Sequence, residues 1–214
     1  NSSNDIRISN NIINGNIDSA YSYNYGIALN LASTNNGRYA YIWNNIITNW
    51  KDGTYVNIGI RVYSSSWTKV YVSNNTIHNS YYGIYGGGGS VAILKNNIAQ
   101  DCYDGFNPDS GSFDSSSDYN ISDISGDAPN ASFAGGYATV SFADETNNDF
   151  HLSPSDTAAK DAGTDLSADS YLAFSDDIDG HARVNNSAWD IGADEGALGV
   201  FYSVVQDGTT DLKT

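Results

Sequence analysis

Two basic side chains in the first half of this 214-residue sequence are candidates for chemistry on an acidic substrate. Arg61 directly follows Gly59-Ile60, and Lys95 directly follows Leu94, so both lie beside short motifs that recur along the chain. A group of this kind could withdraw the proton next to a carboxylate, or neutralise that carboxylate while another base acts. We therefore name Arg61 and Lys95 as catalytic candidates, although solvated surface charge is the preferred interpretation of both.

Aromatic residues near these charges suggest contacts with sugars. The sequence contains 16 Tyr and 4 Trp, most of them in the first 90 residues. Exposed ring faces can stack on sugar rings, and neighbouring basic side chains suit anionic glycans. Packing of the same rings against the protein's own flank is the alternative. The glycan-binding candidates are Trp43, Trp50, Trp67, Arg61 and Lys69.

Acidic residues are concentrated in the second half of the chain. Residues 1–98 contain six Lys or Arg and three acidic residues, whereas residues 99–214 contain three and 22, and the formal net charge is −16. A surface this acidic repels phosphate backbones, so we expect no nucleic-acid partner. The asymmetry indicates two regions with different surfaces. The acidic region could bind divalent cations, or it could keep the protein soluble.

Four aspartates near the C-terminus are candidate metal ligands. The run Asp176-Asp177-Ile178-Asp179-Gly180 lacks the full spacing of a Ca²⁺ loop and its later bidentate Glu. Turn hydrogen bonds and pairing with Arg183 are therefore the preferred roles. We expect no cofactor, with Ca²⁺ as the alternative. The candidate ligands are Asp177, Asp179, Asp190 and Asp194.

Other common catalytic arrangements are absent from the sequence. His78, His151 and His181 have neither Ser–Asp partners nor metal-ligand spacing, and we expect His78 and His151 to be structural. Cys102 is the single cysteine, which excludes an intrachain disulfide and favours a small buried residue. No apolar run reaches the roughly 18 residues that a membrane span needs, so we expect no membrane insertion.

A repeated pattern must position these residues. Asn-Asn pairs flanked by apolar residues recur along the chain, and a Gly followed by an apolar residue trails each pair. The first Asn residues are 34, 30 and 22 positions apart, so the order of the landmarks is constant while the spacers vary. A fainter copy surrounds Asn120. The pairs are Asn10-Asn11, Asn44-Asn45, Asn74-Asn75 and Asn96-Asn97; the trailing dipeptides are Gly26-Ile27, Gly59-Ile60, Gly83-Ile84 and Gly105-Phe106.

Each repeat predicts one coil of a β-solenoid. The 26 Asn, 21 Gly and 16 Tyr favour turns and strands, and no stretch shows the period of a helix. Such coils cannot bury an apolar face alone and must stack. We expect the first Asn of each pair to adopt a left-handed conformation and to stack as an asparagine ladder. The Gly of each dipeptide is expected at a second corner with positive φ, and a β-sandwich is the alternative fold.

The repeat resembles that of right-handed parallel β-helix proteins, which include polysaccharide lyases, tailspikes and many bacterial surface proteins. The resemblance rests on the pattern Ile-x-Asn-Asn-x-Ile followed by Gly-Ile, over roughly residues 5–125. It implies an all-β, right-handed parallel β-helix of about four to five coils. For an enzyme of the pectate- or alginate-lyase type, it implies β-elimination on uronate glycans.

The C-terminal region resembles the last segment of secreted bacterial β-helix proteins, whose usual form is close to FHL…SPAIDAG…DIDGxxR…DIGAxE. The matching runs begin at Asp149, Lys160, Asp177 and Trp189, and residues 155–160 depart from the pattern. A solenoid end exposes apolar surface and strand edges, so we expect this segment to form a C-terminal cap. The expected lid residues are Phe150, Leu152, Ile178, Trp189 and Ile191.

These observations divide the chain and give two functional hypotheses. We expect β-helix coils over residues 1–125 with N-terminal coils missing, an acidic cap over 126–200, and an exit strand or linker over 201–214 toward missing domains. The first hypothesis is a non-catalytic, adhesive module of a larger extracellular or cell-surface protein, bacterial or viral, that binds a polysaccharide or cell-surface glycan. The alternative is a polysaccharide lyase acting on uronate glycans.

Overall fold

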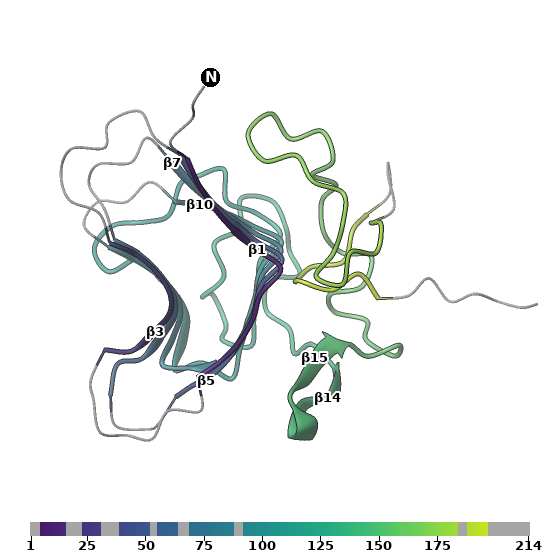
Figure 1. Cartoon of the computed structure of the whole chain (residues 1–214), viewed down its shortest axis with the longest axis horizontal. Coiled ribbons are helices and arrows are strands. Elements are labelled where there is room, and N and C mark those ends of the chain that lie inside the picture. The colour runs from purple at the N-terminus through teal and green to yellow at the C-terminus, as the bar shows by residue number, and fades with distance from the viewer. Residues whose placement is uncertain are drawn as a thin grey trace, which may run out of the picture.

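The protein folds as a right-handed parallel β-helix, which confirms the predicted fold class. In Figure 1 the strands of successive coils recede behind those of the first coil. No helix in the described part of the chain is long and apolar enough to cross a membrane. The computed structural model describes residues 5–15, 23–30, 39–51, 55–63, 69–87, 92–183 and 188–196, so the predicted exit segment 201–214 and Trp67 lie outside the described residues.

Three parallel sheets form the walls, and each coil contributes one strand to each sheet. Sheet A contains β1 (Ile6–Ser9), β4 (Tyr39–Trp43), β7 (Lys69–Ser73) and β10 (Ala92–Lys95). Sheet B contains β2 (Ile12–Asn14), β5 (Ile46–Trp50), β8 (Thr76–Ser80), β11 (Ile98–Gln100) and β13 (Ile121–Ser122). Sheet C contains β3 (Tyr25–Asn30), β6 (Ile58–Tyr63), β9 (Tyr82–Gly87) and β12 (Asp104–Asn107). The described residues thus form four coils, and β13 begins a further turn.

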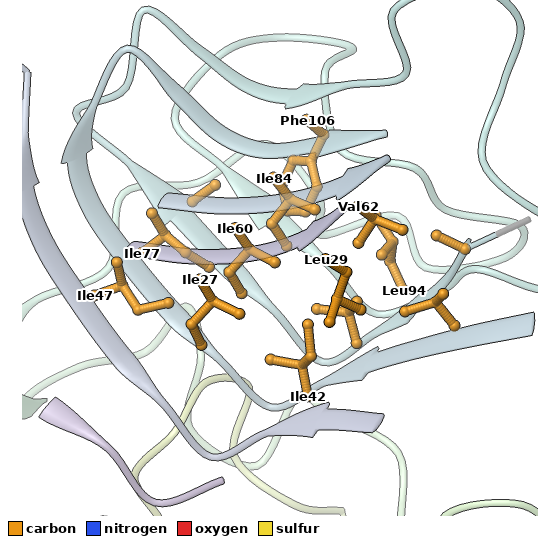
Figure 2. Packing of buried hydrophobic residues seen from close by; sticks show 14 of the residues in the cluster. Ile27, Leu29, Ile42, Ile47, Ile60, Val62, Ile77, Ile84, Leu94 and Phe106 are labelled. Carbon is orange, nitrogen blue, oxygen red and sulfur yellow. The ribbon is translucent and has the colours of Figure 1, made fainter. Parts of the chain in front are cut away.

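Apolar side chains fill the interior in rows that run from coil to coil, and Figure 2 shows them pointing toward one another from the three walls. In the middle coils these side chains are completely buried. Burial of each large aliphatic side chain contributes roughly 1.5–3 kcal/mol, so stacking supplies the main stabilisation. The rows are Ile8, Ile42, Val72 and Leu94 in sheet A, Ile13, Ile47, Ile77 and Ala99 in sheet B, and Ile27, Ile60, Ile84 and Phe106 in sheet C.

An asparagine ladder runs along the corner between sheets A and B. Each Nδ2 donates to the Oδ1 of the next rung at 2.9–3.0 Å, and that Oδ1 also accepts a backbone N–H from the preceding rung at 3.1 Å. All rungs after the first are completely buried. The predicted ladder is confirmed, but it consists of the second Asn of each pair. Its rungs are Asn11, Asn45, Asn75, Asn97 and Asn120.

The first Asn of each pair has the predicted left-handed conformation but not the predicted ladder role. Their φ angles lie between 51° and 57°. The left-handed backbone of the first Asn turns the chain at this corner. The side-chain amide of the first Asn therefore points out of the coil, and that of the second Asn points into it. Within the described residues, Asn96 and Asn74 form the one bond between these outward amides, at 3.1 Å. The members of this set are Asn10, Asn44, Asn74 and Asn96.

The Gly of each trailing dipeptide permits close approach of neighbouring coils, so the expectation of a positive φ is wrong. In the described chain, positive φ values at Gly occur elsewhere, at Gly111, Gly126, Gly180 and Gly192. A Cβ atom on Gly59 would lie 2.6 Å from Cγ2 of Ile77 and 2.8 Å from the carbonyl oxygen of Gly83. Any side chain would therefore push the stacked coils apart.

The C-terminal segment, residues 126–183 and 188–196, packs mainly along the side of the coils (Figure 1). It contains an antiparallel pair, β14 (Phe142–Asp144) and β15 (Asp149–Leu152), joined by the 3₁₀ turn Glu145–Asn147. The outward amides of Asn10 and Asn44 donate to backbone carbonyls of this segment at 2.9 and 2.8 Å. The segment therefore bridges successive coils instead of contacting only the last one.

A part of this region also closes an end of the interior, as a cap should. Ala128 of this segment and Phe113, which precedes the segment, pack against the interior cluster at the last coil. The expected lid residues lie elsewhere: four of them pack with Ile46, Ile98 and Ile121 on the outer side of sheet B, and Trp189 packs on Phe174. These four are Phe150, Leu152, Ile178 and Ile191.

Candidate functional site

A groove of about 620 Å³ lies on the outer side of sheet C. The parallel register places Arg61 of β6 beside Tyr85 of β9, and Tyr85 beside Asn107 of β12. Three neighbouring coils therefore supply one row of side chains that line the groove. Its remaining aromatic and polar lining consists of Tyr23, Tyr25, Tyr82 and Asp109.

Arg61 provides the positive charge of the groove. Its guanidinium carbon lies 5.1 Å from the ring centre of Tyr25 and 4.4 Å from that of Tyr63. These rings orient the guanidinium through cation–π contacts. Within the part of the chain that the structure describes, no carboxylate lies within ion-pair distance of Arg61. Its N–H donors are therefore available to an external carboxylate or hydroxyl group.

The tyrosines combine exposed faces with protonated hydroxyl groups. Tyr23 is 61% exposed, and the rings of Tyr82 and Tyr85 are stacked with centres 5.5 Å apart. Burial, and then the nearby Asp109 carboxylate, raise the pKa of Tyr85 to about 12. Burial also raises the pKa of Tyr82. Both phenols therefore keep their protons near neutral pH and act as hydrogen-bond donors.

A rigid turn forms one end of the groove. Asn107 Oδ1 accepts the N–H of Asp109 at 2.7 Å, while Asn107 Nδ2 donates to Asp104 Oδ2 at 2.6 Å. Asp109 has a φ of 58° and is exposed. The turn thus fixes the backbone while leaving the Asp109 carboxylate accessible.

The other predicted catalytic and glycan-binding residues that the structure describes do not line this groove. Lys95 and Lys69 pair with Asp169 and Asp114, both at 3.3 Å. Trp43 packs against Phe174 of the C-terminal segment, with ring centres 6.2 Å apart. The remaining candidates are Trp50, which packs against the interior cluster, and Trp67, which lies outside the described residues.

The four predicted metal ligands fall into two pairs with different surroundings. Asp177 Oδ1 accepts the N–H of Asp179 at 2.9 Å, and Asp190 accepts the N–H groups of Asp161 and Gly196 at 2.6 and 2.7 Å. These are the turn roles expected from the sequence. Asp179 and Asp194, in contrast, lie close to His151, with one ligand atom of each residue within 4.8 Å of the others. The spacing of the histidines gave no sign of this group.

The remaining chemically notable side chains are buried in structural settings. Cys102 is buried, as predicted, and burial raises the pKa of its thiol to about 12. His78 packs between Phe142 and Phe150, and burial lowers the pKa of its imidazole. Neither residue is accessible to a substrate in the groove.

No protein-family model, curated protein or solved structure matches this chain. A functional assignment therefore depends on the geometry of the groove and of the group around His151.

Proposed function

We propose that this protein is an extracellular, cell-surface β-helix module that binds a polysaccharide or cell-surface glycan in the groove of sheet C, without catalysing a reaction. The observation that carries the proposal is that one groove combines accessible tyrosine faces with the Arg61 guanidinium, which has no carboxylate at ion-pair distance among the described residues. The resemblance of the repeat to bacterial surface proteins supports the extracellular location.

The chemistry of a sugar chain suits this lining. A pyranose ring presents an apolar face of C–H groups, for which a tyrosine ring is a favourable partner, and its edge carries hydroxyl groups. Arg61 and the protonated Tyr82 would donate to sugar oxygens, while Asp109, which accepts from the Tyr85 hydroxyl, has further lone pairs that would accept from sugar hydroxyl groups. An open groove lined by three neighbouring coils suits a polymer better than a closed cavity would.

The test is a glycan array that includes neutral and anionic chains, followed by calorimetry with any ligand found. Tyr25→Ala and Arg61→Met should each weaken binding about tenfold or more, equivalent to about 1.4 kcal/mol. Tyr137→Ala is the matched control, because Tyr137 is 65% exposed but does not line the groove. Absence of any glycan ligand, or unchanged affinity in both groove variants, would contradict the proposal.

A polysaccharide lyase is the second candidate, favoured by the presence of Arg61 in the groove. Arg61 would neutralise a uronate carboxylate, and a separate base would remove the adjacent proton. The raised pKa values of Tyr82 and Tyr85 oppose their use as that base. The assay is ultraviolet absorbance of unsaturated products from pectate, alginate or chondroitin, with and without Ca²⁺. Product formation that Arg61→Met abolishes would replace binding alone by catalysis.

A further inference from the structure

His151 lies among carboxylates that come from separate parts of the C-terminal segment. Its Nδ1 is 2.5 Å from Asp149 Oδ1, and its Nε2 is 3.1 Å from Asp179 Oδ2. With a carboxylate oxygen of Asp194, the ligand atoms of His151, Asp179 and Asp194 lie within 4.8 Å of one another. The result is a compact set of one nitrogen and two oxygen donors.

The backbone holds these side chains in place. Asp194 Oδ2 accepts the N–H of Leu152 at 2.7 Å, which ties Asp194 to β15, the strand that carries His151. Asp179 lies in a turn closed by Asp177, whose side chain is completely buried and accepts the N–H of Asp179 at 2.9 Å. The fold therefore positions the backbone of these residues and the side chain of Asp194, while the side chains of His151 and Asp179 are 34% and 43% exposed.

The two ring nitrogens of His151 have different surroundings. The ionised Asp149 carboxylate accepts a hydrogen bond from Nδ1, so Nε2 is the ring nitrogen that faces the other carboxylates. Nε2 is buried and forms no hydrogen bond of suitable geometry with the described residues, although Asp179 Oδ2 is 3.1 Å away. The surrounding carboxylates need a positive charge beside Nε2, which a proton on Nε2 or a metal ion bound there supplies, and the two compete for the same lone pair. A histidine ligand oriented by a carboxylate on its other nitrogen is the usual arrangement at protein metal sites.

We propose that His151 Nε2, Asp179 and Asp194 bind a divalent first-row transition ion of the Zn²⁺ type, with Asp149 as the positioning residue. Imidazole nitrogen suits Zn²⁺ and its neighbours, whereas Ca²⁺ and Mg²⁺ take oxygen ligands. Ligand bonds of about 2.0–2.2 Å place donor atoms at separations compatible with this group. Water would complete a four-coordinate sphere.

This site differs from the Ca²⁺ site considered from the sequence. Asp190 is directed to Asp161 and Gly196, whereas Asp177 belongs with His181 to a second group of possible ligands that shares Asp179 with this site. The ion would connect β15 with the turn at Asp179 and the chain at Asp194. Its expected effect is stabilisation of the C-terminal segment.

The test is metal binding by the full chain after treatment with a chelator. We expect Zn²⁺ to raise the melting temperature by several degrees and to bind as a single equivalent in calorimetry. Ca²⁺ and Mg²⁺ at the same concentration should leave the melting temperature unchanged. Bound Co²⁺ gives an independent readout, because its visible absorption reports nitrogen and oxygen ligands.

Asp179→Asn and His151→Gln should each abolish the response to Zn²⁺. His181→Gln is the matched control, because His181 belongs to the second group with Asp177 and Asp179 and should leave the response intact if His151 binds the ion. Loss of the response in His181→Gln and not in His151→Gln would place the ion in that second group and overturn the proposal. The melting temperatures of the metal-free variants show whether each has folded. A wild-type chain that ignores Zn²⁺, a Zn²⁺ response that survives in both site variants, or a response to Ca²⁺ alone would overturn the proposal.

Discussion

Arg183 Nη2 donates a hydrogen bond of 3.2 Å to Asn44 Oδ1, joining the C-terminal segment to the second coil. The same guanidinium forms an ion pair of 2.9 Å with Glu195, and its side chain is completely buried. The sequence led us to expect an aspartate as the partner of Arg183, whereas the carboxylate in contact is that of Glu195. Asn44 Nδ2 also donates to the carbonyl oxygen of Asp176 at 2.8 Å. Both the oxygen and the nitrogen of this outward-pointing amide are therefore hydrogen-bonded to the C-terminal segment.

Arg183→Lys should destabilise the protein by about 3 kcal/mol, because a lysine cannot reach all these acceptors and leaves buried groups unpaired. Urea denaturation measures this loss. Arg7→Lys is the control, because Arg7 is exposed, and should change the free energy of unfolding by less than about 0.5 kcal/mol. Equal effects of the two substitutions would contradict a special role for Arg183.

The ladder provides a second prediction. Asn75→Ala should cost about 3 kcal/mol or more, because Asn75 Oδ1 accepts both the backbone N–H and the amide of Asn45 in a completely buried position. Asn11→Ala is the matched control, because Asn11 is the exposed first rung, and should cost about 1 kcal/mol or less. Thermal and urea unfolding of both variants test whether burial determines the energy of a rung.

The fold could be predicted because its determinants are local and repeated. An Asn-Asn pair and a trailing Gly mark the same two places in every coil, and apolar residues beside them define the interior. The division of roles within each pair could not be predicted, because two identical residues differ only in their backbone conformation. Asn44 is left-handed and points outward, whereas Asn45 points inward. The reason for Gly59 could not be predicted either, because it depends on the close approach of Ile77 from the next coil.

The candidate sites were harder to predict because they depend on contacts between distant parts of the sequence. Arg61, Tyr85 and Asn107 become neighbours only through the register of successive coils, whose spacers vary in length. His151 meets Asp179 and Asp194 across turns that follow no repeat. Residue type identified Arg61 as a candidate, but only the geometry placed it among the tyrosines.

The buried thiol offers a probe of the last complete coil. Cys102 should react with a thiol reagent at least about 100-fold more slowly in the native protein than in urea, because exposure requires unfolding and the pKa of the thiol is raised to about 12 by burial. Ser116→Cys in a chain that also carries Cys102→Ala gives an exposed control and should react rapidly in both conditions. Rapid labelling of native Cys102 would show that this coil opens readily.

The final prediction concerns pH, and two aspartates should act in opposite directions. Burial raises the pKa of Asp190 to about 6, with the nearby Glu195 contributing, although N–H groups of Asp161 and Gly196 oppose the shift. The folded protein therefore takes up a proton at Asp190 before the unfolded chain does, and stability due to this group increases as the pH falls from 7 to about 4. Because the pKa of Asp190 is raised by about two units, the gain in the free energy of unfolding is at most about 3 kcal/mol.

Asp118 has the opposite sign, because hydrogen bonds from Ser132 and Phe133 outweigh burial and lower its pKa. Its contribution is present above the unfolded pKa of about 4 and is lost as the pH falls further. Urea denaturation from pH 7 to pH 3 should therefore show the stability of wild type rising relative to Asp190→Asn, and falling relative to Asp118→Asn below pH 4. If both differences changed in the same direction, the assigned cause of one of these shifts would be wrong.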